Sequence, residues 1–190
     1  MSKEDAIQQA ELLGVKHQTI PIEPAFNTFL DMLAGPFTGT QPDTTEENIQ
    51  ARCRGVLLMA ISNKSGKILL TTGNKSEMSV GYATLYGDMA GGFAPIKDVP
   101  KLLVYRLAEY RNQAGEVIPR RVIERPPSAE LAPDQKDSDS LPPYEVLDSI
   151  LARYIEQDQG VAEIVSAGFS EQAVRQVVRL VDRNEYKRRQ

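Results

Sequence analysis

Residues 68–101 read ILLTTGNKSEMSVGYATLYGDMAGGFAPIKDVPK, and this stretch decides the fold. Its apolar start is typical of a buried strand, but it changes at once into a block of threonine, asparagine, lysine, serine and glutamate. In open α/β sheets, ligands bind beyond the carboxyl ends of the strands. The polar block is therefore either a long surface loop or the edge of a binding site.

The composition excludes several classes of protein. The chain has 190 residues, of which 41% are hydrophobic and 25% charged, and this fits one globular domain with its own core. A net charge of −4 gives no electrostatic basis for binding nucleic acid, and no apolar run is long enough to span a bilayer.

The chemistry available to the chain is limited by its scarce cysteine and histidine. With only Cys53 and His17, a disulfide framework, a zinc site and a Cys–His nucleophile pair are all disfavoured, and a reducing compartment is expected. Catalysis would have to use carboxylates, lysines, arginines, hydroxyls and backbone amides. This points to phosphate or metal–phosphate chemistry, or to binding alone.

The order of helix and strand patterns predicts an α/β sheet. Apolar residues at helical spacing predict helices, whereas short apolar runs bounded by proline or glycine predict strands. The expected strands are 15–22, 67–73 and 91–99, and the expected helices are 3–13, 25–35, 46–63, 98–110, 144–157 and 170–189.

Some local features follow from residue type. Asp98 is expected to cap the helix at 98–110, with Pro100 in its first turn, and Ser170 is expected to cap the last helix. The core-facing stripe of that last helix is expected to be Val174, Val177, Val178 and Val181. Cys53 falls on an apolar helical face, so we interpret it as a small core residue and not as a reactive thiol.

Two polar segments are predicted to be loops. Residues 36–45 are rich in threonine and proline, and residues 115–143 are rich in proline, aspartate and serine. The sequence contains no internal repeat.

Residue types alone leave the polar block open between two interpretations. Thr72 could contact a nucleotide and Glu77 could hold Mg²⁺ against phosphates, or Glu77 could simply stand in the first turn of a helix. Lys101 at a helix start opposes the helix dipole and favours an anionic neighbour such as phosphate. The residue type of Ser128 alone indicates no function. Arg52 is a residue of the kind usually found on the solvent-exposed face of a helix.

Five sequence blocks, in order, resemble the synthetase domain of NAD⁺ synthetases. They are NIQARCRG, LLTTGNKSEMSVGYATLYGDMAGGF, IKDVPK, RPPSAEL and LPPYEVLD, and the resemblance extends over nearly all of residues 1–190. The central block is similar to the long, glutamine-dependent type. The resemblance implies a Rossmann-like parallel sheet flanked by helices, the adenine nucleotide alpha hydrolase-like (ATP pyrophosphatase) fold.

The resemblance also implies a reaction, which belongs to NAD biosynthesis. A ligase of this family amidates deamido-NAD to NAD⁺ through an adenylate, using ATP, Mg²⁺ and ammonia and releasing AMP and pyrophosphate. A homodimer in the cytoplasm is implied, with a glutaminase domain in the parent protein to supply ammonia.

The resemblance assigns roles to individual residues of this chain. ATP would be contacted by Thr72, Lys101 and Ser128, and Glu77 would lie where Mg²⁺ and substrate meet. The pocket for deamido-NAD would be lined by Asn48, Arg52, Glu77, Tyr82, Ala83, Thr84 and Leu85, and closed by Tyr186 and Lys187.

One departure from the family pattern changes the expectation. The family's phosphate loop has the sequence SGGxDS, and no SGG occurs in this chain. We therefore expect an incomplete synthetase domain without its first strands and with little or no turnover alone. A non-catalytic nucleotide-binding or dimerisation module is the alternative, and another amidating enzyme of the same fold is a weaker one.

Overall fold

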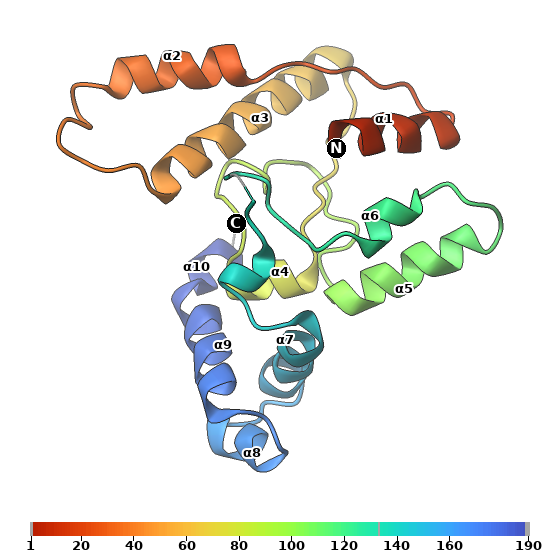
Figure 1. Ribbon diagram of the computed structural model, residues 1–190, viewed down its shortest axis with the longest axis vertical. Helices are drawn as coiled ribbons and strands as arrows, with labels where there is room; N and C mark the ends of the chain where they lie inside the picture. Colours follow the sequence, from red (N-terminus) through yellow and green to blue (C-terminus); the bar gives the residue numbers. More distant parts are fainter. Residues whose placement is uncertain (1, 133, 189–190) are drawn as a thin grey trace.

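The computed structural model describes residues 2–132 and 134–188. Its helices fall into an upper group, a central group and a lower group (Figure 1). The upper group contains α1 (Ser2–Leu12), α2 (Glu23–Leu33) and α3 (Thr44–Ser65), with α2 and α3 side by side. The central group contains α4 (Lys75–Val80), α5 (Lys101–Asn112) and α6 (Arg120–Glu124).

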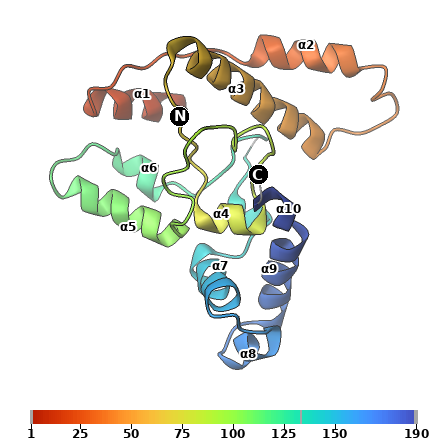
Figure 2. The ribbon, with the colours of Figure 1, turned by 180° about the vertical axis from the view of Figure 1, so that it is seen from behind.

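The lower group holds the main hydrophobic core, and the view from behind shows the same grouping (Figure 2). It contains α7 (Tyr144–Leu151), α8 (Val161–Ser166) and α9 (Glu171–Arg183), with a π-helical turn at Ala152–Glu156. Helix α10 (Glu185–Arg188) follows α9 and lies beside α4. Val174, Val177 and Val181 recur at helical spacing on α9 and are buried against α7, as the sequence predicts.

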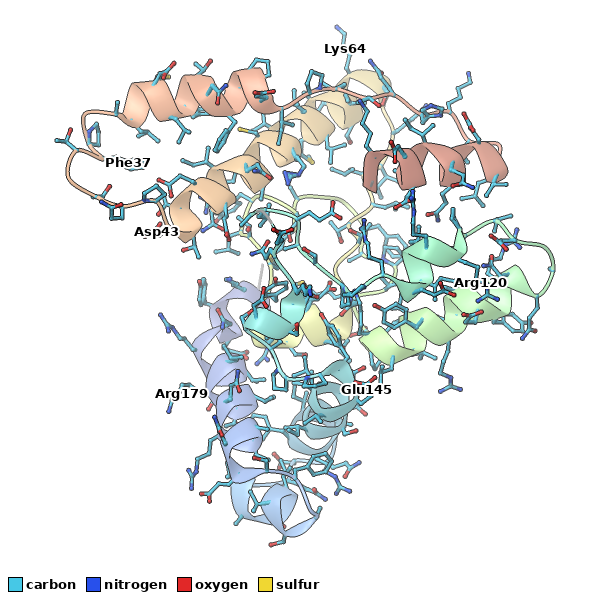
Figure 3. The ribbon with its side chains drawn as sticks, viewed as in Figure 1. Phe37, Asp43, Lys64, Arg120, Glu145 and Arg179 are labelled. Atoms are coloured by element: carbon cyan, nitrogen blue, oxygen red, sulfur yellow. The ribbon has the colours of Figure 1, made fainter. Side chains whose placement is uncertain are left out.

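Helix α3 begins and ends where its sequence provides the appropriate groups. Asp43 accepts from the amide of Thr45, and the Glu46 carboxylate accepts from the amide of Asp43 in a capping box. Gly66 ends the helix in the left-handed region, at φ 67°. Figure 3 shows Asp43 at one end of this long helix and Lys64 near the other.

Helix α4 lies inside the polar block of the sequence. Asn74 Oδ1 accepts from the amide of Glu77 at 3.0 Å, and the Glu77 carboxylate accepts from the amide of Asn74 at 3.3 Å. Gly81 stops the helix in the left-handed region at φ 71°. The interpretation of Glu77 as a first-turn helix residue is therefore confirmed, although it does not exclude a role in a site.

The three predicted strands are not regular strands in the described residues. Between 67–73 and 91–99 there is one parallel bridge, Leu70 with Phe93, where the Thr71 amide donates to the Phe93 carbonyl at 2.9 Å. Residues 15–22 form neither a helix nor a strand. A strand needs hydrogen-bonding neighbours, and only this single bridge provides one within residues 2–132 and 134–188.

Several other local predictions need correction. Asp98 does not cap α5, because the helix begins later and Pro100 occupies the N-cap position. Ser170 is the N-cap residue of α9, but its side chain makes no capping hydrogen bond. Helix 170–189 is divided into α9 and α10, and residue 189 lies outside the described residues.

The predicted loops are also more structured than their composition suggests. Residues 115–143 contain α6 and a 3₁₀ turn at Asp137–Asp139, and residues 36–45 include the start of α3. Cys53 is free and buried, as predicted, whereas Val56 on the same helix is 65% exposed. In the described part of the chain, no helix is both long and apolar enough to cross a membrane.

Candidate functional site

A cavity of about 700 Å³ collects the residues predicted to contact ATP. Thr72, at the end of the bridged segment, lines it together with Lys101 at the start of α5 and Ser128 after α6. Glu77 and Tyr82 line the same cavity. Thr72 and Ser128, which are 56 positions apart in the sequence, thus face the same cavity.

An ion pair crosses this cavity between α4 and α5. Lys101 Nζ lies 3.0 Å from Glu77 Oε1, and both side chains are less than one fifth exposed. The same ammonium group lies 5.7 Å from the ring centre of Tyr105 and 5.5 Å from that of Tyr144. The anionic neighbour expected for Lys101 is therefore present, and in this structure it is a carboxylate.

A buried aspartate supports the aromatic side of the cavity. Asp137 Oδ2 accepts from the Tyr144 hydroxyl at 2.6 Å, whereas its Oδ1 is buried and has no hydrogen-bond partner among the described residues. Burial, followed by this hydrogen bond and the charge of Asp137, raises the pKa of Tyr144 above its ordinary value. Burial and the charge of Asp137 also raise the pKa of Tyr82.

The predicted deamido-NAD residues meet at the loop that follows α4. Thr84 Oγ1 donates to Asn48 Oδ1 at 2.8 Å, and Arg52 Nε donates to the carbonyl of Leu85 at 3.2 Å. Gly55 of α3 lets the two segments approach, since a Cβ there would lie 2.9 Å from the Tyr86 carbonyl oxygen.

The C-terminal end of the chain holds the same loop from the other side. Lys187 Nζ donates to the carbonyls of Gly81 and Ala83, each at 2.7 Å. Burial lowers the pKa of Lys187, while the charge of Asp88 acts in the opposite direction. Tyr186 is 55% exposed, so Lys187 contacts the predicted pocket segment more closely than its neighbour does.

A second, smaller cavity of about 190 Å³ lies beside this loop. Glu77, Tyr82 and Ala83 line it, and the first two also line the larger cavity. The two spaces therefore share a wall made by α4 and the start of the loop. Thr72, Lys101 and Ser128 line the larger cavity, whereas of the predicted deamido-NAD residues only Glu77, Tyr82 and Ala83 line either of the two. The others line neither cavity; they are Asn48, Arg52, Thr84, Leu85, Tyr186 and Lys187.

The family model for NAD synthase matches residues 1–190. The chain belongs to the NAD synthase family. Glutamine-dependent NAD(+) synthetase of Acinetobacter baylyi is 59% identical over 193 residues, covering 100% of this chain and 36% of the relative. The Thermotoga maritima protein of the same name is 54% identical over 191 residues, covering 100% of the chain and 33% of the relative. This NAD synthase chain thus spans about a third of the length of these curated relatives.

Two solved structures are similar in fold to this chain. Glutamine-dependent NAD⁺ synthetase from Acinetobacter baumannii, in complex with ADP, has a TM-score of 0.64 at 53% identity, covering 99% of this chain and 34% of that one. NMN synthetase from Francisella tularensis has a TM-score of 0.81 at 27% identity, covering 98% and 69%. The similarity to these two structures supports the α/β fold of NAD synthases for this chain.

Several residues that shape the candidate site were not predicted from the sequence. Asp88 accepts from the Thr84 amide at 2.7 Å and lines both cavities. Tyr105, Asp137 and Tyr144 surround Lys101, and no spacing rule predicts that they meet. The blocks YGDMAGG and LPPYEVLD contain Asp88 and Tyr144, so the signal for these two was present in the motifs.

The described side chains can be compared with the ligands that Mg²⁺ usually takes in proteins. In residues 2–132 and 134–188 no group of three or more histidine, cysteine, aspartate or glutamate side chains could hold a metal ion. Mg²⁺ is commonly bound through one or two carboxylates together with substrate phosphates. Glu77, facing both cavities, fits a Mg²⁺ that is held mainly by ATP phosphates.

Proposed function

We propose that this chain forms one wall of an active site that amidates deamido-NAD to NAD⁺ at the expense of ATP. The observation that carries the proposal is the shared cavity, where Thr72, Glu77, Lys101 and Ser128 face one space. Membership of the NAD synthase family and the ADP complex of the Acinetobacter baumannii neighbour support it. The parent protein would be a carbon–nitrogen ligase of NAD biosynthesis.

On the ATP side, this chain would supply cationic and hydroxyl groups for the phosphates. Lys101 is an ammonium held in a partly dry pocket, where its attraction for phosphate is stronger than in water. Thr72 and Ser128 would donate from opposite sides of the cavity. Glu77 would hold Mg²⁺, which neutralises phosphate charge when it is bound.

On the other side, the loop after α4 would hold deamido-NAD. Its nicotinate carboxylate would attack the α-phosphorus of ATP, pyrophosphate would leave, and ammonia would then displace AMP from the adenylate. Arg52 and Lys187 donate to backbone carbonyls of Tyr82–Leu85, and Asn48 accepts from the Thr84 hydroxyl. The ordered loop would orient the carboxylate toward the phosphates. A closed wall would also keep water from the adenylate.

The wider setting of the site belongs to the same proposal. The curated relatives are named glutamine-dependent, so glutamine would be the nitrogen source, through a glutaminase domain of the parent protein. A parallel sheet would continue from the single bridge at Leu70 and Phe93. The free thiol of Cys53 fits the reducing cytoplasm.

A homodimer is supported by one observation. Apolar side chains on α2 and α3 remain exposed, including Phe29, Met32, Val56, Leu58 and Ile61. Surface groups of this kind often mark interfaces between subunits. Sedimentation over a range of protein concentrations tests this, and a purely monomeric profile would remove the homodimer from the proposal.

Turnover by the chain in isolation should be low. The SGGxDS motif, whose amides hold phosphates in the family, does not occur in the sequence. Losing preorganised donors of this kind costs on the order of 10² to 10³ in rate each. NAD⁺ formation at an ordinary enzymatic rate, from deamido-NAD, ATP and ammonia, would contradict this part of the proposal.

The ATP assignment can be tested without turnover. An acylating reagent modifies lysine amines, and mass spectrometry gives the rate at each lysine separately. MgATP should slow the acylation of Lys101, and the Ser128→Ala variant should need more MgATP for the same protection. Lys67, which does not line the cavity, is the internal control. Equal acylation of Lys101 with and without MgATP would refute the assignment.

A further inference from the structure

Helix α5 begins without a cap from its own sequence. Pro100 occupies the N-cap position and makes no side-chain capping bond, although the amides of the first helical turn require acceptors. This helix start carries Lys101, the cation of the candidate site. What fixes the first turn of α5 therefore also fixes the position of this ammonium group.

Two side chains from other helices provide the missing acceptors. Ser76 Oγ accepts from the amide of Lys101 at 2.8 Å, and Asp148 Oδ2 accepts from the amide of Leu102 at 3.0 Å. The Ser76 hydroxyl in turn donates to Asp148 Oδ1. Ser76 is fully buried, so these bonds are shielded from water.

The same cluster is joined to both partners of the ion pair. Ser76 directly precedes Glu77 on α4, and Asp148 lies one helical turn after Tyr144 on α7. Tyr144 faces the Lys101 ammonium at 5.5 Å. A carboxylate at the start of a helix is also stabilised by the positive end of the helix dipole. Asp148 thus connects α4, α5 and α7 at one point.

We propose that Asp148, acting with Ser76, is a positioning residue that holds Lys101 against Glu77 for the phosphates of ATP. The catalytic significance rests on the proposed function, but the geometric claim does not. Asp148 bonds the first turn of α5 and does not line either cavity. Its effect on ligand binding would therefore pass through the α5 backbone and Lys101.

A purely structural role makes a different prediction. If Asp148 only anchored α7, its loss would loosen the whole region. Lys75 reports on this, because it lies on α4 beside Ser76, is similarly buried, and pairs with Glu156 instead of Glu77. Selective change at Lys101 indicates positioning, whereas equal change at both lysines indicates general loosening.

The experiment measures acylation rates of Lys101 and Lys75 in the full chain, without ligand, for three variants. Asp148→Ala removes both acceptor oxygens, Asp148→Asn keeps the shape and one oxygen, and Ser149→Ala is the control at the neighbouring residue. Ser149 bonds only within its own helix, to the carbonyl of Glu145. Circular dichroism confirms that each variant retains its helices.

We expect Asp148→Ala to raise the Lys101 rate about tenfold, with Lys75 within about twofold of the unsubstituted chain. Asp148→Asn should fall between the two, and Ser149→Ala should change neither lysine. An unchanged Lys101 rate in Asp148→Ala would overturn the proposal, as would a parallel rise at both lysines or a loss of helix content.

A second readout separates this inference from the proposed function. The MgATP concentration that half-protects Lys101 should rise in Asp148→Ala and return toward the original value in Asp148→Asn. If MgATP fails to protect Lys101 in the unsubstituted chain, the proposed function fails while the acylation rates without ligand still test the positioning. If protection is normal in Asp148→Ala, the positioning role fails alone.

Discussion

Thr84 donates its hydroxyl hydrogen to Oδ1 of Asn48 at 2.8 Å, and this bond joins the loop after α4 to helix α3. Both residues were predicted to contact deamido-NAD, yet here each is a partner of the other. Thr84 is 7% exposed, so the bond is largely shielded from solvent. The finding indicates that these two residues hold α3 and the loop together, and neither of them lines the two cavities beside Glu77.

The Thr84–Asn48 bond should contribute measurably to stability. Thr84→Val keeps the side-chain shape but removes the donor and leaves Asn48 Oδ1 unpaired, so we expect a loss of about 1–2 kcal/mol in the free energy of unfolding. Urea denaturation measures it. Thr38→Val is the control, because Thr38 bonds an exposed carbonyl in a surface turn. Equal losses in both variants would contradict the prediction.

Gly55 should tolerate no side chain where α3 meets the loop. A Cβ at this position would lie 2.9 Å and 3.0 Å from the carbonyl oxygens of Tyr86 and Gly87. Gly55→Ala should therefore destabilise the chain by about 1–3 kcal/mol, despite the better helix propensity of alanine. Gly35→Ala, with nothing within 4 Å of its Cβ, should be near neutral. Thermal unfolding compares the two, and an unaffected Gly55→Ala would show that the contact is loose.

Asp5 should anchor helix α1 to α6. It is 4% exposed, accepts from Arg121 Nε at 2.7 Å, and lies 3.8 Å from Arg125. Asp5→Ala should destabilise the fold by about 1–3 kcal/mol and speed proteolysis within residues 2–22. Arg175→Ala breaks an exposed pair with Glu171 and should cost less than about 0.5 kcal/mol. Similar costs for the two variants would refute an anchoring role.

Tyr144 should make the stability of the chain depend on alkaline pH. Its pKa in the folded chain is raised by burial and by Asp137, so the native state keeps a proton that the unfolded chain loses above about pH 10. This contribution is complete below that pH and declines as pH rises further. The lowered pKa of Lys187 acts in the opposite direction, since its native state loses its proton first.

The test follows the free energy of unfolding between pH 9 and 11.5. Tyr144→Phe should reduce the alkaline decline by up to about 1.4 kcal/mol per pH unit. It should also cost about 1–3 kcal/mol at neutral pH, because Asp137 loses its hydrogen-bond partner. Tyr110→Phe, at an exposed tyrosine, is the control. The same alkaline slope in all three proteins would rule out this account of Tyr144.

Several elements that local bonds determine carry a sequence signal, although the two capping boxes and helix α4 itself were not predicted. Asp43 with Glu46 and Asn74 with Glu77 form capping boxes, and Gly66 and Gly81 end their helices. The core stripe on α9 was also visible, because Val174, Val177 and Val181 repeat at helical spacing. The burial of Cys53 was predicted correctly for the same reason.

Features that depend on distant partners could not be predicted in this way. The first turn of α5 is capped by Ser76 and Asp148 from other helices, so the local choice of Asp98 was wrong. The prediction of a strand at 15–22 was wrong, because a strand forms only where a neighbouring segment pairs with its backbone. Lys101 was expected to have an anionic neighbour, but only the fold identifies it as Glu77.

Binding of deamido-NAD to this chain tests the central claim most directly. Isothermal titration calorimetry should give saturable heat with the unsubstituted chain. Binding should be weaker in Lys187→Met, where the carbonyls of Gly81 and Ala83 lose their common donor. Absence of saturable heat with the folded, unsubstituted chain would contradict the claim that this loop forms a wall of the deamido-NAD site.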